Sequence, residues 1–140
     1  MPIQSLARED VVHAPPETPL SNLAERMRDE RVGSIVITNE QSPVGIVTDR
    51  DLTTRVLANG EPSDGLRAQD VMTSEVIVAS SDHGVYECAQ MMSEQGIRRL
   101  PICDENDELC GIITADDLLE LFSDEQQQLA QIIQAQRPPY

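Results

Sequence analysis

The sequence contains no lysine and no tryptophan, and only 2% of its residues are aromatic. The core of a folded domain must therefore be built from aliphatic side chains, methionine and alanine. All ten basic residues are arginines, and they face 25 acidic residues, which gives a formal net charge of −15. A charge of that sign repels polyanions, so we do not expect a nucleic-acid-binding protein. A small anion held by a local cluster of arginines stays compatible with this charge.

The absence of lysine and the excess of acid are typical of proteins from a salt-loaded cytoplasm. Molar salt there screens the repulsion between carboxylates within roughly 3 Å. We interpret the composition as halophilic; an acidic protein from a GC-rich genome is the alternative.

Long apolar runs are missing as well. No run approaches the roughly 18 residues of a membrane helix, and the N-terminus has no apolar targeting segment. The three cysteines, Cys88, Cys103 and Cys110, are odd in number and have no C-x-x-C spacing. This pattern favours a reducing compartment over a disulfide framework. We therefore expect a cytoplasmic protein that does not contact a membrane.

Catalytic and metal-binding patterns are also absent from the sequence. The two histidines, His13 and His83, have no partner at a spacing that suits a metal site. We find no Ser-His-Asp or Cys-His arrangement and no phosphate-binding glycine loop. The sequence predicts neither an enzyme nor a metalloprotein.

An internal repeat is the strongest positive signal. Residues 11–14 (VVHA) resemble residues 76–79 (VIVA), and residues 45–52 (GIVTDRDL) match residues 111–118 (GIITADDL). Each copy reads as strand, helix, strand, strand, helix. Apolar residues at i, i+3, i+4 and i+7 mark the first helix of each copy, and hairpin patterns follow. The helical positions are Leu20, Leu23, Ala24 and Met27, and then Val85, Cys88, Ala89 and Met92.

These elements predict an α+β fold in which two β-α-β-β-α units pack sheet to sheet with pseudo-twofold symmetry. We assign residues 1–58 to the first repeat, 59–66 to a linker and 67–122 to the second repeat. Residues 123–140 are predicted to form a C-terminal helix and tail. Leu129, Ile132 and Ile133 form a narrow apolar stripe on that helix, and Pro138 and Pro139 end it. The helix could pack on its own module or serve a dimer or partner contact.

The chain resembles a tandem pair of cystathionine-β-synthase (CBS) domains, also called a Bateman module. The resemblance rests on G-h-h-T-x-x-D-L at residues 45–52 and 111–118, on residues 96–102 (GIRRLPI) and on residues 70–73 (DVMT). It implies that an adenosine-type ligand, such as AMP, ADP, ATP or S-adenosylmethionine, binds in a cleft between the repeats. It also implies a homodimer that regulates an unidentified effector protein.

Two Thr-x-x-Asp pairs, Thr48 with Asp51 and Thr114 with Asp117, are the first candidate ligand contacts. A threonine and an acid three residues apart at a helix start also form a capping box. A carboxylate there can accept hydrogen bonds from both ribose hydroxyls, and the helix N-terminus favours an anion. The two roles can coexist, so both stay open.

Arginines are the candidate phosphate ligands. Arg98 and Arg99 form a local cationic spot, whereas Gly33 and Ser34 occupy that place in the first copy. Pairing with nearby carboxylates is the alternative role. Arg50 could add a phosphate contact, although a solvated or salt-bridged arginine is the more ordinary outcome. The two clefts are therefore expected to differ.

The walls around an adenine ring are assigned from the resemblance alone. Pro101 has no N–H, so its strand is expected at a sheet edge or along a cleft. The wall candidates lie in residues 12–14 and 78–80 and on the following strands, and they include Ala14, Ile35, Ala79 and Pro101. We thus expect a regulatory module that senses an adenosine ligand. The alternative is a dimerisation module that binds no ligand.

Overall fold

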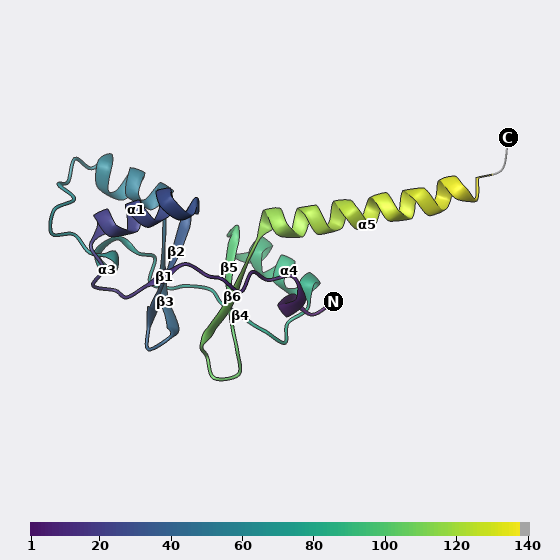
Figure 1. Ribbon diagram of the computed structural model, residues 1–140, viewed down its shortest axis with the longest axis horizontal. Coiled ribbons are helices and arrows are strands. Elements are labelled where there is room, and N and C mark those ends of the chain that lie inside the picture. The colour runs from purple at the N-terminus through teal and green to yellow at the C-terminus, as the bar shows by residue number, and fades with distance from the viewer. Residues whose placement is uncertain (138–140) are drawn as a thin grey trace.

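The structure, a computed structural model, describes residues 1–137 and shows two similar lobes side by side (Figure 1). Each lobe holds one repeat. The helices and strands of the first repeat are β1 (His13–Ala14), α1 (Leu20–Glu30), β2 (Ser34–Asn39), β3 (Ser42–Thr48) and α2 (Asp49–Asp51). A π-helical segment, Leu52–Leu57, continues α2. The elements that follow along the chain are α3 (Ala68–Val71), β4 (Ala79–Ser80), α4 (Val85–Gln95), β5 (Arg99–Cys103), β6 (Leu109–Thr114) and α5 (Ala115–Ala135). Of these, α3 lies at the start of the second repeat but packs in the first lobe, whereas the others form the second lobe.

Each repeat contains one three-stranded mixed sheet, in the order β1-β2-β3 or β4-β5-β6. The short first strand runs parallel to the central strand, and the other two strands form an antiparallel hairpin. The hairpins of the two repeats touch at their turns, where the N–H of Leu109 donates to the carbonyl of Gln41 at 2.8 Å. The predicted α+β fold of two β-α-β-β-α units is confirmed.

The apolar helical stripes bury as their spacing predicts. Leu20, Leu23 and Met27 pack in the first core, and the equivalent Val85, Cys88 and Met92 pack in the second. The fourth position of each stripe is less buried: Ala24 is exposed and Ala89 is half-buried. Gly96 ends α4 in the left-handed region, with φ 64°, as its position in the sequence predicts.

The repeats exchange short segments. Ile3, at the N-terminus, is fully buried in the second core, and the backbones of Arg8 and Ile112 form two hydrogen bonds of 3.0 Å. In the reverse direction, Ala68 of α3 is buried in the first core. Thr73 makes the same pair of backbone bonds with Ile46 on β3. Each core is therefore completed by the first residues of the other repeat.

Of the two alternatives for the Pro101 strand, the sheet edge is wrong, because β5 is the central strand of its sheet; Arg99 at the start of β5 does line a cavity. In the first repeat the N–H of Val36 donates to the carbonyl of Val12 at 3.1 Å. Pro101 occupies the equivalent position and has no N–H to donate. Parallel pairing consequently begins at Ala79 and Ile102, one position later than in the first repeat. Proline is tolerated in this central strand because β4 pairs with β5 only from Ile102 onward, so no strand needs a hydrogen bond from the nitrogen of Pro101.

The C-terminal region departs from the prediction of two successive helices. Residues 123–135 continue the helix that begins after Thr114, so α5 is a single helix of 21 residues. Its second half projects away from both lobes (Figure 1). The alternative in which this helix packs on its own module is therefore wrong for the described chain. The predicted stop at Pro138 and Pro139 lies outside the described residues.

Candidate functional site

Both Thr-x-x-Asp pairs form capping boxes where a strand turns into a helix. The hydroxyl of Thr48 accepts from the N–H of Asp51 at 3.2 Å, and the Asp51 carboxylate accepts from the N–H of Thr48 at 2.9 Å. Thr114 and Asp117 repeat this arrangement at 3.1 Å and 3.0 Å. The boxes leave one oxygen of each carboxylate free of the cap. A contact of either pair with ribose stays a prediction.

The second pair lies on the wall of a cavity of about 370 Å³ between the two repeats. A cavity of this size is large enough for a nucleoside. Four stretches of chain line it: the exchanged N-terminal segment, the turn before β2, the β5–β6 hairpin and the first turns of α5. The lining residues are Arg8, Asp10, Val11, Val12, Arg31, Val32, Gly33, Ser34, Arg99, Ile112, Thr114, Asp116, Asp117 and Glu120.

Asp117 is the most strongly engaged carboxylate of this cavity. One of its oxygens completes the cap, and the other lies 3.1 Å from the guanidinium of Arg8. Burial on its own would raise the pKa of Asp117. Hydrogen bonds from Thr114 and the charge of Arg8 outweigh this effect, so the pKa falls below the ordinary value of 3.8. Asp117 is therefore an anion at neutral pH.

The adjacent arginines of the sequence separate in the structure. Arg99 lines the cavity. Arg98 instead pairs with Asp116 at 3.3 Å, and both side chains are largely exposed. For Arg98 the structure therefore shows the carboxylate-paired alternative. Asp116 itself lines the cavity, whereas Arg98 does not.

Two cavity arginines were missed from the sequence. Arg8 arrives through the segment exchange, which leaves no local pattern to recognise. Arg31 did leave a signal, because it aligns with Gly96 at the end of the equivalent helix. Arg31 adopts the left-handed conformation there, with φ 57° and ψ 44°. A non-glycine residue in this region is uncommon and draws attention to the site.

The first pair has different surroundings. Asp51 lies 3.6 Å from Arg55, one turn along its own helix, and Arg55 also donates to the carbonyl of Val71 at 3.0 Å. Thr73 stands at the place that Arg8 occupies beside Asp117, so no arginine enters by the exchanged segment. Arg50 is exposed at the start of α2. These contacts make the surroundings of the two carboxylates unequal.

The four candidate wall residues are buried in the protein interior. Ala14 and Ile35 belong to the first core, Ala79 belongs to the second, and Pro101 is among the fully buried side chains. Their side chains have almost no exposed surface. The whole-residue exposure of all four is close to zero, so they offer almost no surface to a ligand in this conformation, and their role as contacts stays a prediction.

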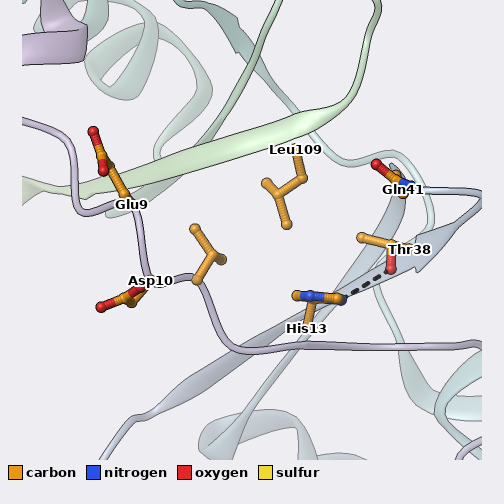
Figure 2. A pocket seen from close by; sticks show the side chains of 7 residues that line it. Glu9, Asp10, His13, Thr38, Gln41 and Leu109 are labelled. Atoms are coloured by element: carbon orange, nitrogen blue, oxygen red, sulfur yellow. Dashed lines mark hydrogen bonds between the residues drawn. The ribbon is translucent and has the colours of Figure 1, made fainter.

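A second cavity, of about 470 Å³, shares Asp10 and Val11 of the N-terminal segment with the first. Figure 2 shows the His13 ring beside Thr38 at one end and the carboxylates of Glu9 and Asp10 at the other. No arginine lines it, so it lacks the guanidinium groups that suit a phosphate.

Within residues 1–137, no helix combines the length and the apolar character that crossing a membrane requires. In the same residues, no group of three or more His, Cys, Asp or Glu side chains is placed to hold a metal ion.

The sequence family described as the CBS domain matches this chain twice, at residues 3–58 and 68–124. The two matches cover most of the chain. This protein belongs to the CBS-domain family. The chain is thus a tandem CBS pair, and in it the two domains exchange segments and form a cavity between them.

Two similar proteins come from archaea. The chain is 40% identical over 120 residues to the uncharacterized protein MK0525 of Methanopyrus kandleri, which covers 85% of this chain and 61% of that relative. It therefore spans less than two thirds of this relative's length. A crystal structure of an uncharacterized conserved protein from Pyrococcus horikoshii superimposes with a TM-score of 0.77 at 30% identity. The match covers 86% of this chain and 90% of the other.

The CBS domain pair of protein MJ0100 has been solved in complex with 5′-methylthioadenosine and S-adenosyl-L-methionine. It superimposes with a TM-score of 0.79 over 89% of this chain and 98% of that one. At 23% identity this likeness shows a shared fold.

Proposed function

We propose that this CBS pair is a regulatory module that binds an adenosine-type ligand in the cavity beside Asp117. The observation that carries the proposal is the placement of an anionic Asp117 and three arginines, Arg8, Arg31 and Arg99, around one cavity between the repeats. The complex of protein MJ0100 with two adenosine compounds supports this ligand class.

The chemistry of the cavity fits a nucleoside with a charged substituent. The Asp117 carboxylate can accept from ribose hydroxyls, since ionised acceptors make the stronger hydrogen bonds. The arginines can bind phosphate oxygens through paired N–H donors. Three acids, Asp10, Asp116 and Glu120, share the wall and oppose a large negative charge. AMP, ADP, ATP and S-adenosylmethionine are the ligands to compare.

The output is proposed to be a change of shape or assembly that acts on a separate effector protein, rather than catalysis. A ligand can shift such an equilibrium only by its difference in affinity for the two states. The competing function is a constitutive dimerisation module, in which the capping boxes serve the fold alone. The hydrogen bonds that already engage both Asp51 and Asp117 are the observation in favour of it.

Calorimetric titration of the wild-type chain and of Asp117→Asn and Asp51→Asn tests the proposal. Asparagine keeps an oxygen that can accept from the N–H of Thr114, so the cap survives while the charge is lost. Losing a charge-assisted hydrogen bond costs about 1.5–3 kcal/mol, so Asp117→Asn should weaken binding roughly 10- to 100-fold. Asp51→Asn is the matched control in the other repeat and should leave this site's affinity nearly unchanged.

Two results would contradict the proposal. Wild-type protein that binds none of the four ligands would favour the dimerisation module. Binding that Asp117→Asn leaves unaltered would show that the ligand occupies another place.

A further inference from the structure

The second half of α5 carries apolar side chains that nothing in the described chain covers. Every residue from Phe122 to Arg137 is exposed, and the helix projects beyond both lobes (Figure 1). Four large apolar side chains stand on it, with exposed fractions of 42% for Phe122, 61% for Leu129, 54% for Ile132 and 64% for Ile133. Exposed apolar surface gathered in one place marks an interaction site more often than a scatter of single residues does.

These four residues, which we call the α5 stripe, share one face of the helix. At about 100° per residue they fall within a sector of about 100°. The stripe continues the face that Leu118 buries in the second core, and it runs past the end of that core. The part of α5 that projects from the lobes is residues 122–135, and an isolated helix of about that length is marginal in water. A partner along the stripe would therefore also stabilise the projecting part of the helix.

Charge is distributed unevenly along α5. Its first eleven residues hold Asp116, Asp117, Glu120, Asp124 and Glu125. Residues 126–136 carry no charge, and Arg137 follows them. The acidic half of one α5 is therefore complementary to the neutral, arginine-ended half of another α5 that runs in the opposite direction.

We propose that the α5 stripe binds the α5 stripe of a second copy of this chain as an antiparallel helix pair. This arrangement sets Arg137 of each copy beside the acidic half of the other copy's helix. It also keeps the lobes, which carry most of the −15 net charge, at opposite ends of the pair. A parallel pair would bring the lobes together and set Glu125 against Glu125 at the edge of the stripe. Like charges that close repel one another.

The antiparallel pair also gives the projecting helix a second role. The first turns of α5 place Asp116, Asp117 and Glu120 in the cavity wall, and the remainder of the same helix carries the stripe. One rigid element thus joins the cavity to the interface. The pairing itself does not depend on ligand binding and goes beyond the proposed function.

Sedimentation analysis of the full chain, in low salt and in molar KCl, tests the interface. Leu129→Asp introduces a charge at the centre of the stripe. Gln131→Asp introduces the same charge about 200° around the helix and serves as the matched control. We expect a wild-type dimer, an unchanged Gln131→Asp dimer and at least a tenfold weaker dimer for Leu129→Asp.

Neither substitution lies in a core, so both variants should stay folded; Gln131→Asp should melt at the wild-type temperature, and Leu129→Asp should melt lower only by the stabilisation that the partner helix gives. Wild-type protein that is monomeric in both buffers overturns the proposal. A dimer that Leu129→Asp leaves intact also overturns it, because another face must then form the contact.

Spin-label distances test the direction of the helices. Labels attached through Gln126→Cys lie near the middle of an antiparallel pair, and labels attached through Gln136→Cys lie near its two ends. At about 1.5 Å per residue, the two labels at position 136 should be about 20 Å farther apart along the axis than the two labels at position 126. Short distances at both positions would indicate a parallel pair and overturn the proposal. The wild-type chain, with its native cysteines, is the labelling control.

Discussion

The guanidinium of Arg8 lies 3.1 Å from the carboxylate of Asp117, although 109 positions separate them in the sequence. The exchanged N-terminal segment makes this contact by pairing Arg8 with Ile112 on β6. The contact occupies the carboxylate oxygen that the cap leaves free. Arg8 is 72% exposed although Asp117 is only 13% exposed, and with the guanidinium largely in water the ion pair contributes on the order of 1 kcal/mol. A ligand can therefore displace Arg8 at little cost.

The first prediction concerns Arg8→Gln. Removing the guanidinium frees one Asp117 oxygen, so the affinity for adenosine itself should rise by at most about fivefold, the equivalent of 1 kcal/mol. Ligands that carry phosphate should gain less or lose affinity, because a cationic side chain of the wall is gone. Titration calorimetry with adenosine and AMP measures both effects. Arg28→Gln, outside the cavity and paired with Asp29, is the control. Weaker adenosine binding in Arg8→Gln would contradict the prediction.

The pH dependence of stability should carry the signature of Asp117. Its pKa is lower in the folded protein than the ordinary 3.8, despite burial, because of hydrogen bonds from Thr114 and the Arg8 charge. A group of this kind stabilises the fold above its unfolded pKa, and the contribution is lost as the pH falls through the folded pKa. Between neutral pH and about pH 3, the wild type should therefore lose more unfolding free energy than Asp117→Asn.

Urea denaturation across this range checks the difference. Asp64→Asn, in the exposed linker, provides the control and should follow the wild-type curve. Parallel curves for the wild type and Asp117→Asn would show that Asp117 is not stabilised as an anion.

The exchanged segments explain why the repeated motif begins with glycine at positions 45 and 111. A Cβ on Gly45 would lie 2.9 Å from Cγ of Met72 and 3.0 Å from the carbonyl oxygen of Thr73. A Cβ on Gly111 would meet Ala7 at 3.1 Å and the carbonyl oxygen of Arg8 at 3.3 Å. Each glycine therefore lets a segment from outside its repeat lie close against the strand.

Gly45→Ala should consequently cost about 1–3 kcal/mol of unfolding free energy, as overpacking does, and Gly111→Ala should cost less. Denaturant melts measure both. The reverse order, or no loss in either variant, would show that the segments yield without cost.

Local signals in the sequence predicted most of the fold. Helical spacing identified the buried Leu23 and Cys88, and the Thr-x-x-Asp pairs identified the helix starts with the correct hydrogen bonds. Contacts that depend on which lobe a segment joins could not be predicted in this way. Ile3 packs in the second core because of the exchange, and no pattern around residue 3 records that.

In the site, too, local motifs identified some residues, and contacts between distant segments placed the others. Asp117 and Arg99 were found because motifs carry them, whereas Arg8 reaches the cavity only through the exchanged segment. The continuous α5 was also missed, because the apolar stripe of residues 129–133 reads as a separate short helix when its partner is unknown.

The last prediction concerns Arg31. Its left-handed backbone conformation favours glycine, whereas its position in the cavity wall favours a cationic side chain. It ends α1 with φ 57°, whereas the equivalent Gly96 ends α4 with φ 64°. The left-handed conformation costs a residue with a Cβ about 1 kcal/mol, and glycine escapes this cost. Arg31→Gly should therefore be up to about 1 kcal/mol more stable than Arg31→Ala, which loses the same guanidinium and keeps the unfavourable conformation.

Both variants should bind a phosphate-bearing ligand less tightly than the wild type and to the same extent, since both remove one cationic side chain from the cavity wall. Denaturant melts and AMP titrations on the two variants separate the effects. Equal stability of the glycine and alanine variants would mean that the turn carries no strain. Unchanged affinity in both would mean that Arg31 faces the cavity without contacting the ligand. If Arg31→Gly is more stable than Arg31→Ala but binds the ligand less tightly than the wild type, ligand binding would explain why an arginine stands where the other repeat has glycine.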